Sequence, residues 1–219
     1  GLKTRFTVQT NERRKPLTVE LNLPGVHNVL NSLAGIAVAA ELEIDDAPLL
    51  KALAEFSGVD RRLQVQGTVM TTVGPVTFVD DYGHHPTELA ATIAAARDAW
   101  PGRRLVVCFQ PHRYTRTLAL IDDFAQVLST VDALILTNVY SAGETPLAGA
   151  DGKSLARAVR VRGAVEPIFI EDLSELPAVL GQILRADDVV LAVGAGSIGA
   201  VATMLPRALT ARVAARAKQ

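Results

Sequence analysis

The sequence has few of the features that mark a secreted, membrane-spanning or polyanion-binding chain. Its 219 residues contain one cysteine, Cys108, which excludes a disulfide framework and, inside the apolar run Leu105–Phe109, suits a buried strand residue in a reducing compartment. The net charge is −1, from 22 basic and 23 acidic residues, so no nucleic acid is expected as a partner and an anionic small molecule would need a local basic site. The longest uncharged stretch, Val189–Pro206, has glycines in its middle, which favours a strand, a turn and a helix over a membrane span, and we recognise no signal peptide.

What is present is a chain with 49% hydrophobic residues, enough for a folded core in one large domain or in one domain and part of another. Near the start, alternating residues Thr4–Thr10 and Leu17–Leu23 flank the polar turn Asn11–Pro16 and predict a hairpin. Apolar residues at helical spacing then predict a helix from Val26 to Glu41 and a second from about Pro48 to Phe56.

This hairpin with two helices makes a thin domain, and the sequence begins at Gly1 without a methionine. We therefore expect residues 1–64 to be the last part of a larger domain, with residues 65–219 forming a domain of their own.

From Leu63 onward the pattern changes to a hairpin across Gly74 and Pro75, followed by strands that alternate with helices. The predicted strands are Val76–Val79, Leu105–Phe109, Ala133–Thr137, Pro167–Ile170 and Asp188–Val193. The predicted helices are Pro86–Ala99, Thr117–Ser129, Lys153–Val161, Ser174–Leu184 and Ser197–Ala217. This alternation predicts an α/β fold of the Rossmann-like kind, with a mostly parallel sheet covered by helices on both faces.

Two polar loops, Asp80–Pro86 and Gln110–Arg116, each follow a predicted strand directly, and they hold three of the four histidines. In an open parallel sheet, ligands collect outside the carboxyl ends of the strands. The two loops therefore predict one site.

In the second loop, Arg113 and Arg116 stand three residues apart, where a strand leads into a helix whose free amides favour anions. Two guanidinium groups can hold a carboxylate or phosphate in bidentate fashion, and the strand-end position beside His112 favours this function. The alternative is a surface pair bonded to acids such as Asp122 or Asp123.

In the first loop, adjacent acids and histidines suggest a metal site, but neighbouring His84 and His85 do not face one cation easily. We expect no metal there. His85 precedes Pro86 and is predicted to open a helix, whereas Tyr82 and His84 are predicted to contact substrate. Either Asp80 or Asp81 is expected to contact a nucleotide hydroxyl or to hold the loop.

The fourth histidine opens a separate motif in which His27, Asn28 and Asn31 share the N-terminal end of a predicted helix face. These side chains either read the polar edge of a base or cap the helix, and the sequence leaves both interpretations open.

Gly194–Gly199 fits the pattern GxGxxG after a strand, but no second strand with a ribose-binding acid follows it. We predict a tight strand-to-helix turn, with anion binding possible and no nicotinamide cofactor.

Taken together, several strings of the sequence resemble the Mur ligase family, and within it the branch that joins L-alanine to UDP-N-acetylmuramate. They are His27–Asn31, Gly58–Arg62, Asp80–Glu88, Gln110–Thr117 and Val139–Glu144, and the resemblance runs over essentially the whole chain. A second branch, which joins a peptide to UDP-N-acetylmuramate for recycling, shares the histidine loop but differs in the loop around Arg113.

The resemblance implies the end of a central ATP-binding domain, residues 1–64, and a C-terminal amino-acid-binding domain, residues 65–219, of a cytoplasmic enzyme of peptidoglycan synthesis. It implies ATP and Mg²⁺ as cofactors, and UDP-N-acetylmuramate and L-alanine as partners that react through an acyl phosphate.

The resemblance also implies roles for individual residues. His27, Asn28 and Asn31 would contact adenine, Arg62 would lie by the phosphates, and Asp81 would approach the nucleotide. Tyr82, His84, His112, Arg113 and Arg116 would hold the alanine carboxylate or the reacting centre, with His84, Arg113 and Arg116 as the catalytic residues.

No segment fits the complete phosphate-binding pattern of a glycine-rich loop that ends in Gly-Lys-Ser or Gly-Lys-Thr. We therefore expect the principal phosphate and magnesium sites upstream of Gly1, and we expect residues 1–219 alone to be inactive. A non-catalytic nucleotide-binding or interaction module is the alternative from another class.

Overall fold

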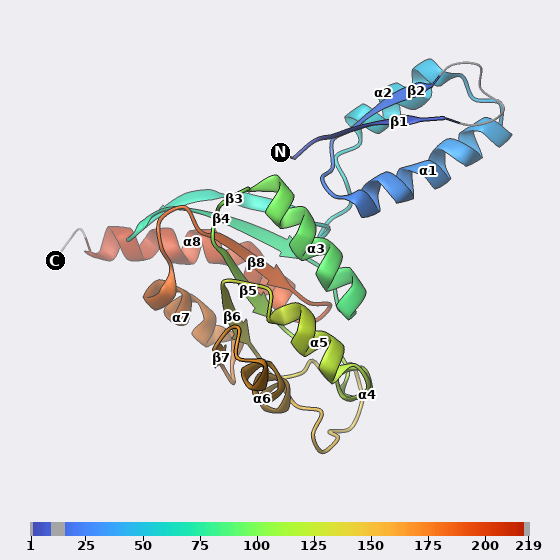
Figure 1. Cartoon of the computed structure of the whole chain (residues 1–219). Coiled ribbons are helices and arrows are strands. Elements are labelled where there is room, and N and C mark those ends of the chain that lie inside the picture. The colour runs from blue at the N-terminus through green and yellow to red at the C-terminus, as the bar shows by residue number, and fades with distance from the viewer. Residues whose placement is uncertain (1, 10–15, 217–219) are drawn as a thin grey trace.

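The computed structural model describes residues 2–9 and 16–216. Its N-terminal unit pairs β1 (Thr4–Val8) with β2 (Leu17–Leu21) in an antiparallel hairpin, beside helices α1 (Val26–Glu41) and α2 (Asp46–Glu55). The predicted hairpin and helices are confirmed, although the predicted turn Asn11–Pro16 lies almost wholly outside the described residues. In Figure 1 this unit stands to the upper right of the rest of the molecule.

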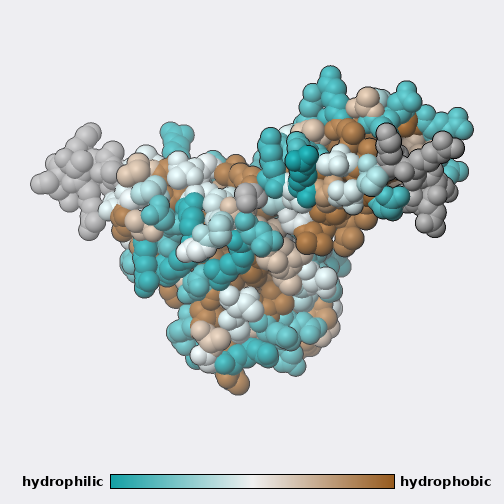
Figure 2. All heavy atoms as spheres, turned by 45° about the horizontal axis from the view of Figure 1, so that its top comes forward, coloured by the Kyte–Doolittle hydropathy of each residue, from teal (hydrophilic) through white to brown (hydrophobic). Residues whose placement is uncertain are grey.

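The N-terminal unit has a small core of its own. Val19 and Leu21 of β2 and Ile36 of α1 are buried in it, and the leucines of α2 pack against them. The opposite face of α1 leaves Val26 and Leu30 exposed, and apolar colour is visible on this unit in Figure 2.

The C-terminal unit contains the remaining strands and helices. Its strands are β3 (Gln64–Thr71), β4 (Gly74–Asp81), β5 (Leu105–Phe109), β6 (Ala133–Leu136), β7 (Pro167–Phe169) and β8 (Val189–Val193). Its helices are α3 (Pro86–Ala99), α4 (Tyr114–Ala119), α5 (Ile121–Leu128), α6 (Gly152–Arg162), η1 (Leu173–Glu175), α7 (Leu176–Ile183) and α8 (Ile198–Arg216).

One sheet joins these strands in the order β3-β4-β8-β5-β6-β7. Only β3 is antiparallel, paired with β4 across the predicted hairpin, and the other neighbours are parallel. The predicted α/β fold with a mostly parallel sheet is therefore confirmed. The last strand in the chain, β8, lies between β4 and β5, so the loops that follow these three strands meet at one edge.

Helices cover both faces of the sheet (Figure 1). Val107 and Phe109 of β5 point toward α3, α5 and α6, whereas Val106 and Cys108 point toward α7 and α8. Burial on both faces explains why the strands read as continuous apolar runs rather than as alternating ones.

One predicted helix, Thr117–Ser129, is wrong in its extent. Two helices, α4 and α5, occupy the region, and α4 begins at Tyr114. The backbone of Leu120, with φ −120° and ψ 22°, ends the first helix and starts the second. Its side chain is half-buried against the core beneath α3 and α5, so tertiary packing fixes a bend that no proline or glycine marks.

Candidate active site

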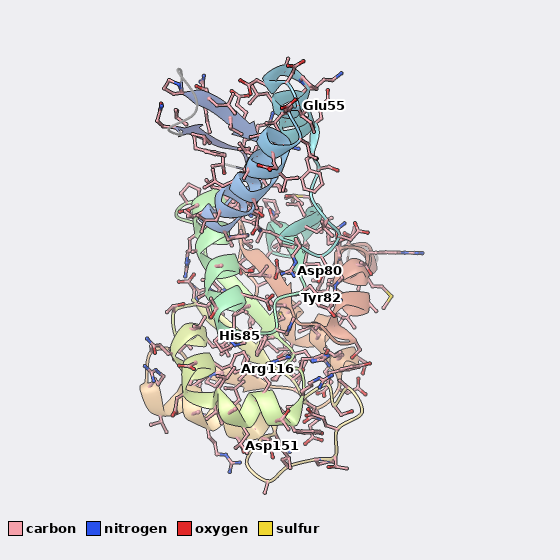
Figure 3. The ribbon with its side chains drawn as sticks, turned by 90° about the vertical axis from the view of Figure 1, so that its right-hand side faces the viewer. Glu55, Asp80, Tyr82, His85, Arg116 and Asp151 are labelled. Carbon is pink, nitrogen blue, oxygen red and sulfur yellow. The ribbon has the colours of Figure 1, made fainter. Side chains whose placement is uncertain are left out.

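The loops after β4, β5 and β8 are joined by backbone hydrogen bonds at the carboxyl ends of the strands. Gly194 N donates to Asp81 O at 3.0 Å, and Gln110 N donates to Val193 O at 3.0 Å. The predicted convergence of the histidine and arginine loops is thus present. Figure 3 shows Tyr82, His85 and Arg116 on one side of the C-terminal unit.

A row of four rings runs across this edge. The ring centroids are 5.5 Å apart for Tyr82 and His84, 5.9 Å for His84 and His112, and 5.4 Å for His112 and Tyr140, with the last pair stacked. Three of these side chains belong to the predicted site. Tyr140 was missed as a single residue, because its contact comes from a backbone bridge to His112 that no local pattern reveals.

The two arginines flank the ring row. Arg113 has a left-handed φ of 71° directly before α4, and its Nη1 lies 3.8 Å from Glu144 Oε1. Arg116 Nη1 lies 3.3 Å from His112 O, to which it donates. Among the described residues, neither arginine is bonded to Asp122 or Asp123, but the half-exposed side chain of Arg113 does pair with another acid, Glu144.

Burial and the nearby guanidinium of Arg116 lower the pKa of His112 below its usual range, with further contributions from His84 and Arg113. His112 is therefore neutral at pH 7. A neutral ring beside two arginines leaves the guanidinium groups as the cations of this site.

His85 starts α3, as predicted. Its Nδ1 accepts from Thr87 N, Pro86 takes the first helical position, and Glu88 Oε2 accepts from His84 N at 3.0 Å and His85 N at 3.2 Å. This capping box fixes the direction of the histidine loop.

Asp81 holds the loop from the inside. Its carboxylate accepts from Leu63 N at 2.8 Å, Gly83 N at 2.8 Å and the Thr92 hydroxyl at 3.1 Å. Of the two predicted roles, the loop-holding one is what these bonds carry out.

Arg61 ties the turn after β8 to β4. Its Nε lies 3.1 Å from Asp80 Oδ2, its Nη2 donates to Gly194 O, and its guanidinium lies 5.0 Å from the centre of the Tyr82 ring. Burial raises the pKa of Asp80, although Arg61 opposes that shift. Sequence reasoning did not single out Arg61, because its partners are far away in the chain.

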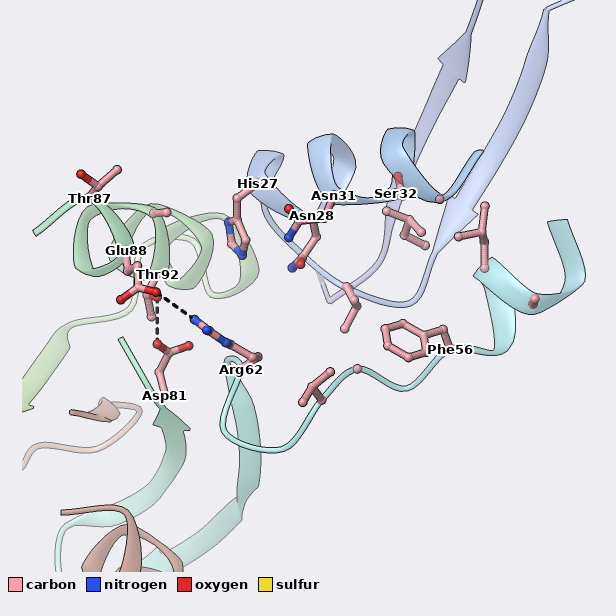
Figure 4. A pocket seen from close by; sticks show the side chains of 18 of the residues that line it. His27, Asn28, Asn31, Ser32, Phe56, Arg62, Asp81, Thr87, Glu88 and Thr92 are labelled. Atoms are coloured by element: carbon pink, nitrogen blue, oxygen red, sulfur yellow. Dashed lines mark hydrogen bonds and ion pairs between the residues drawn. The ribbon is translucent and has the colours of Figure 1, made fainter. Parts of the chain in front are cut away.

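A cavity of about 890 Å³ lies between the N-terminal unit and α3 (Figure 4). Its walls are mostly apolar, and its polar lining includes His27, Asn28, Asn31, Arg62 and Asp81. The five side chains for which the family resemblance implies nucleotide contact therefore line one cavity.

The polar groups of this cavity are only partly engaged by the protein. Asn28 Nδ2 donates to Pro24 O at 2.8 Å, and Gly25, the residue that precedes α1, makes no side-chain cap hydrogen bond. Burial, outweighing the nearby Asp81 carboxylate, lowers the pKa of His27, so its ring is neutral at pH 7. Neutral amide and imidazole groups suit the polar edge of a base better than they suit a phosphate.

The turn Gly194–Gly199 is a packed connection, as predicted. A Cβ at Gly196 would lie 2.6 Å from the Tyr140 ring, and one at Gly199 would lie 2.3 Å from Arg61. Gln110 Oε1 accepts from Ile198 N at 2.9 Å and so occupies an amide at the start of α8. This N–H group is therefore not free to bind an anion at the start of α8.

The sequence contains one Gly-Lys-Ser triplet, Gly152–Ser154. It opens α6, but Asp151 Oδ1 accepts from Ser154 N at 2.6 Å, and Lys153 pairs with Glu171. A carboxylate therefore stands where a phosphate would bind, and Leu147 replaces the first glycine of the complete pattern. The triplet is a helix start and not a phosphate loop.

Among residues 2–9 and 16–216, no three acidic, histidine or cysteine side chains gather as a metal site. In the same part of the chain, no helix is long and apolar enough to cross a membrane.

Fold and site together define a doubly wound α/β domain with a polar, cation-bearing edge at the carboxyl ends of its strands. Residues 61–196 match the family model described as "Mur ligase, glutamate ligase domain", and the chain belongs to this family.

Relatives and solved structures agree with this assignment. The chain is 60% identical over 200 residues to UDP-N-acetylmuramate--L-alanine ligase of Aromatoleum aromaticum, covering 89% of this chain and 42% of the relative. It is 57% identical to the ligase of the same name from Methylococcus capsulatus, covering 95% of this chain and 44% of that protein. The crystal structure of UDP-N-acetylmuramate-alanine ligase from Thermotoga maritima has a TM-score of 0.77 at 32% identity and covers 98% of this chain and 44% of that one. The chain thus spans less than half the length of the curated relatives it matches.

Proposed function

We propose that this chain is the C-terminal part of an ATP-dependent ligase that joins L-alanine to UDP-N-acetylmuramate in the cytoplasmic synthesis of peptidoglycan. The observation that carries the proposal is the 60% identity to a ligase of that name over 89% of the chain. The separate cores of the two units support a division into an ATP-binding part and an amino-acid-binding domain, with the boundary a few residues before the predicted one after residue 64, because Leu63 is buried in the C-terminal core and Gln64 begins β3.

In this proposal, Arg113 and Arg116 bind the carboxylate of L-alanine, and Tyr82, His84 and His112 border it. The lactyl carboxylate of UDP-N-acetylmuramate receives a phosphoryl group from ATP, the alanine amine attacks the acyl phosphate, and phosphate leaves. Charge builds up on the reacting oxygens during these steps, and His84, Arg113 and Arg116 stabilise it.

The cavity beneath α1 is assigned to the nucleotide. His27, Asn28 and Asn31 contact adenine, Arg62 lies by the phosphates, and Asp81 shapes the wall nearest to them. Its size and its neutral polar groups fit a base and ribose. The described residues bring no metal ligands together, so Mg²⁺ is assigned no residue of this chain.

Phosphate release by the intact gene product tests the proposal. Release should require ATP, Mg²⁺, UDP-N-acetylmuramate and L-alanine together, and should collapse in Arg113→Ala and Arg116→Ala. The matched control is Arg157→Ala, an exposed arginine of α6 whose guanidinium donates to Ser154 Oγ. Release that depends on a peptide and not on L-alanine would instead assign the chain to the recycling ligase. No alanine- or peptide-dependent release would favour a binding module.

We also propose that residues 1–219 alone do not catalyse the reaction, since they contain no complete phosphate loop. The same assay on the 219-residue chain tests this, and alanine-dependent release would contradict it.

A further inference from the structure

Glu88 is a side chain that touches both candidate sites. We infer that Glu88 is a positioning residue that couples the nucleotide cavity to the amino-acid loop, by holding Arg62 on one side and His84 on the other. The inference rests on the proposed function for the identity of the two ligands, a nucleotide phosphate and an amino-acid carboxylate.

The two carboxylate oxygens of Glu88 face different partners. Oε2 accepts from His84 N and His85 N and lies 3.4 Å from His84 Nδ1. Oε1 lies 3.5 Å from Arg62 Nη1, a contact drawn in Figure 4. Glu88 also lines the nucleotide cavity, so one side chain reaches from its wall to the ring row.

These contacts keep Glu88 charged. The backbone N–H of His84, together with nearby His84 and Arg62, lowers its pKa despite the opposing effect of burial. The carboxylate is therefore a competitor, inside the cavity, for any anion that approaches Arg62.

A phosphate that binds Arg62 in the cavity has to displace the carboxylate of Glu88 from the guanidinium group. Both side chains of this pair are partly exposed, so the contact is weak and a multiply charged phosphate can displace it. Glu88 then keeps its contacts with the backbone N–H and the ring of His84 beside the arginine loop. By thermodynamic reciprocity, ligands at the two sites affect each other through this carboxylate.

The substitution Glu88→Gln removes the negative charge of the side chain and keeps its role in capping α3. A glutamine Oε1 can still accept from the two backbone N–H groups, but an uncharged amide no longer attracts Arg62 by charge and is a weaker acceptor for His84 Nδ1. We expect the Mg²⁺ complex of adenylyl imidodiphosphate to bind the intact protein about two- to fivefold more tightly, the range of an exposed ion pair. We expect the KM for L-alanine to rise several-fold, with the thermal midpoint unchanged.

Tighter binding of the ATP analogue together with a higher KM for L-alanine distinguishes this role from general loosening of the loop, because loosening would weaken the binding of both ligands. Glu88→Ala removes cap and charge together and should lower the thermal midpoint as well. The matched control is Glu175→Gln, since Glu175 closes the same kind of capping box on η1 by accepting from Asp172 N at 2.9 Å, and it is exposed. This control should leave all three quantities unchanged.

Calorimetric titration with the ATP analogue, followed by steady-state kinetics in L-alanine, tests the inference. Weaker or unchanged analogue binding in Glu88→Gln, at an unchanged thermal midpoint, would overturn it, as would an unchanged KM for L-alanine. Wild-type protein that shows no alanine-dependent release would overturn the proposed function instead. In that case the analogue titration, which needs no reaction, still decides whether Glu88 restrains Arg62.

Discussion

Glu144, in the loop after β6, caps helix α4 by accepting two hydrogen bonds from Thr115 in the first turn of that helix. Its Oε2 accepts from Thr115 N at 3.1 Å and its Oε1 from the Thr115 hydroxyl at 2.6 Å. These bonds lower the pKa of Glu144, so the carboxylate stays charged opposite Arg113. The first turn of α4, which carries Arg116 and directly follows Arg113, is thus held by a residue of the loop after β6.

Removing this cap should disturb the arginines without touching the nucleotide cavity. Because the first turn of α4 loses its cap, we expect Glu144→Ala to raise the KM for L-alanine several-fold and to leave the KM for ATP unchanged. Glu144→Gln can keep both bonds to Thr115 and should restore most of the loss. Equal changes in both KM values would show that Glu144 does not act on the arginine loop.

Arg61 and Arg62 are adjacent in the chain, but we expect only Arg61 to contribute strongly to the free energy of unfolding. The side chain of Asp80 is 1% exposed, so Arg61→Met leaves a buried carboxylate without its partner and should lower the free energy of unfolding by about 3 kcal/mol. The Arg62–Glu88 pair is at the surface, and Arg62→Met should cost less than about 1 kcal/mol. Urea unfolding of the two variants measures the difference, and equal losses would contradict it.

A glycine is required at position 152 because a neighbouring segment leaves no room for a side chain, and not because the backbone has a left-handed φ. A Cβ there would lie 2.1 Å from the backbone oxygen of Thr137, so Gly152→Ala should destabilise the chain by about 2 kcal/mol or more. A Cβ at Gly35, inside α1, would meet nothing within 4 Å, and the same substitution there should stabilise by up to about 1 kcal/mol. Thermal unfolding compares the pair, and a harmless Gly152→Ala would show that α6 starts elsewhere.

Stability should fall as the pH drops below about 6.5. Burial lowers the pKa of both His27 and His112 from the ordinary 6.5, so in that window the unfolded chain binds protons that the folded chain does not. The loss begins near the ordinary pKa and ends once the pH passes the lowered one. Urea unfolding at pH 7 and at pH 5.5 measures this loss. In His112→Gln the free energy of unfolding should decrease less between these two pH values than in wild type, and an equal decrease would exclude His112 as a contributor.

The strands and the α3 start could be predicted because their causes are local. The predicted strand Leu105–Phe109 has the same bounds as β5. A strand that is buried on both faces is a continuous apolar run, and such a run can be recognised from the sequence alone. His85, Pro86 and Glu88 are adjacent in sequence and form the predicted capping box.

What the sequence could not reveal depends on contacts between distant segments. The bend at Leu120, the cap from Glu144 and the pair of Arg61 with Asp80 arise only once the sheet has assembled. The same holds for Asp81, whose bonds to Leu63, Gly83 and Thr92 show that it holds the loop, which is one of its two predicted roles.

The central claim is that Arg113 and Arg116 bind the carboxylate of the incoming amino acid. The most direct test compares kcat/KM of the intact protein for L-alanine and for L-alaninamide, which keeps the amine and lacks the charge. We predict that wild type prefers L-alanine, and that Arg113→Ala and Arg116→Ala each reduce this preference roughly 10- to 100-fold, the range of one charge-assisted hydrogen bond. A preference that stays the same in both variants would contradict the account.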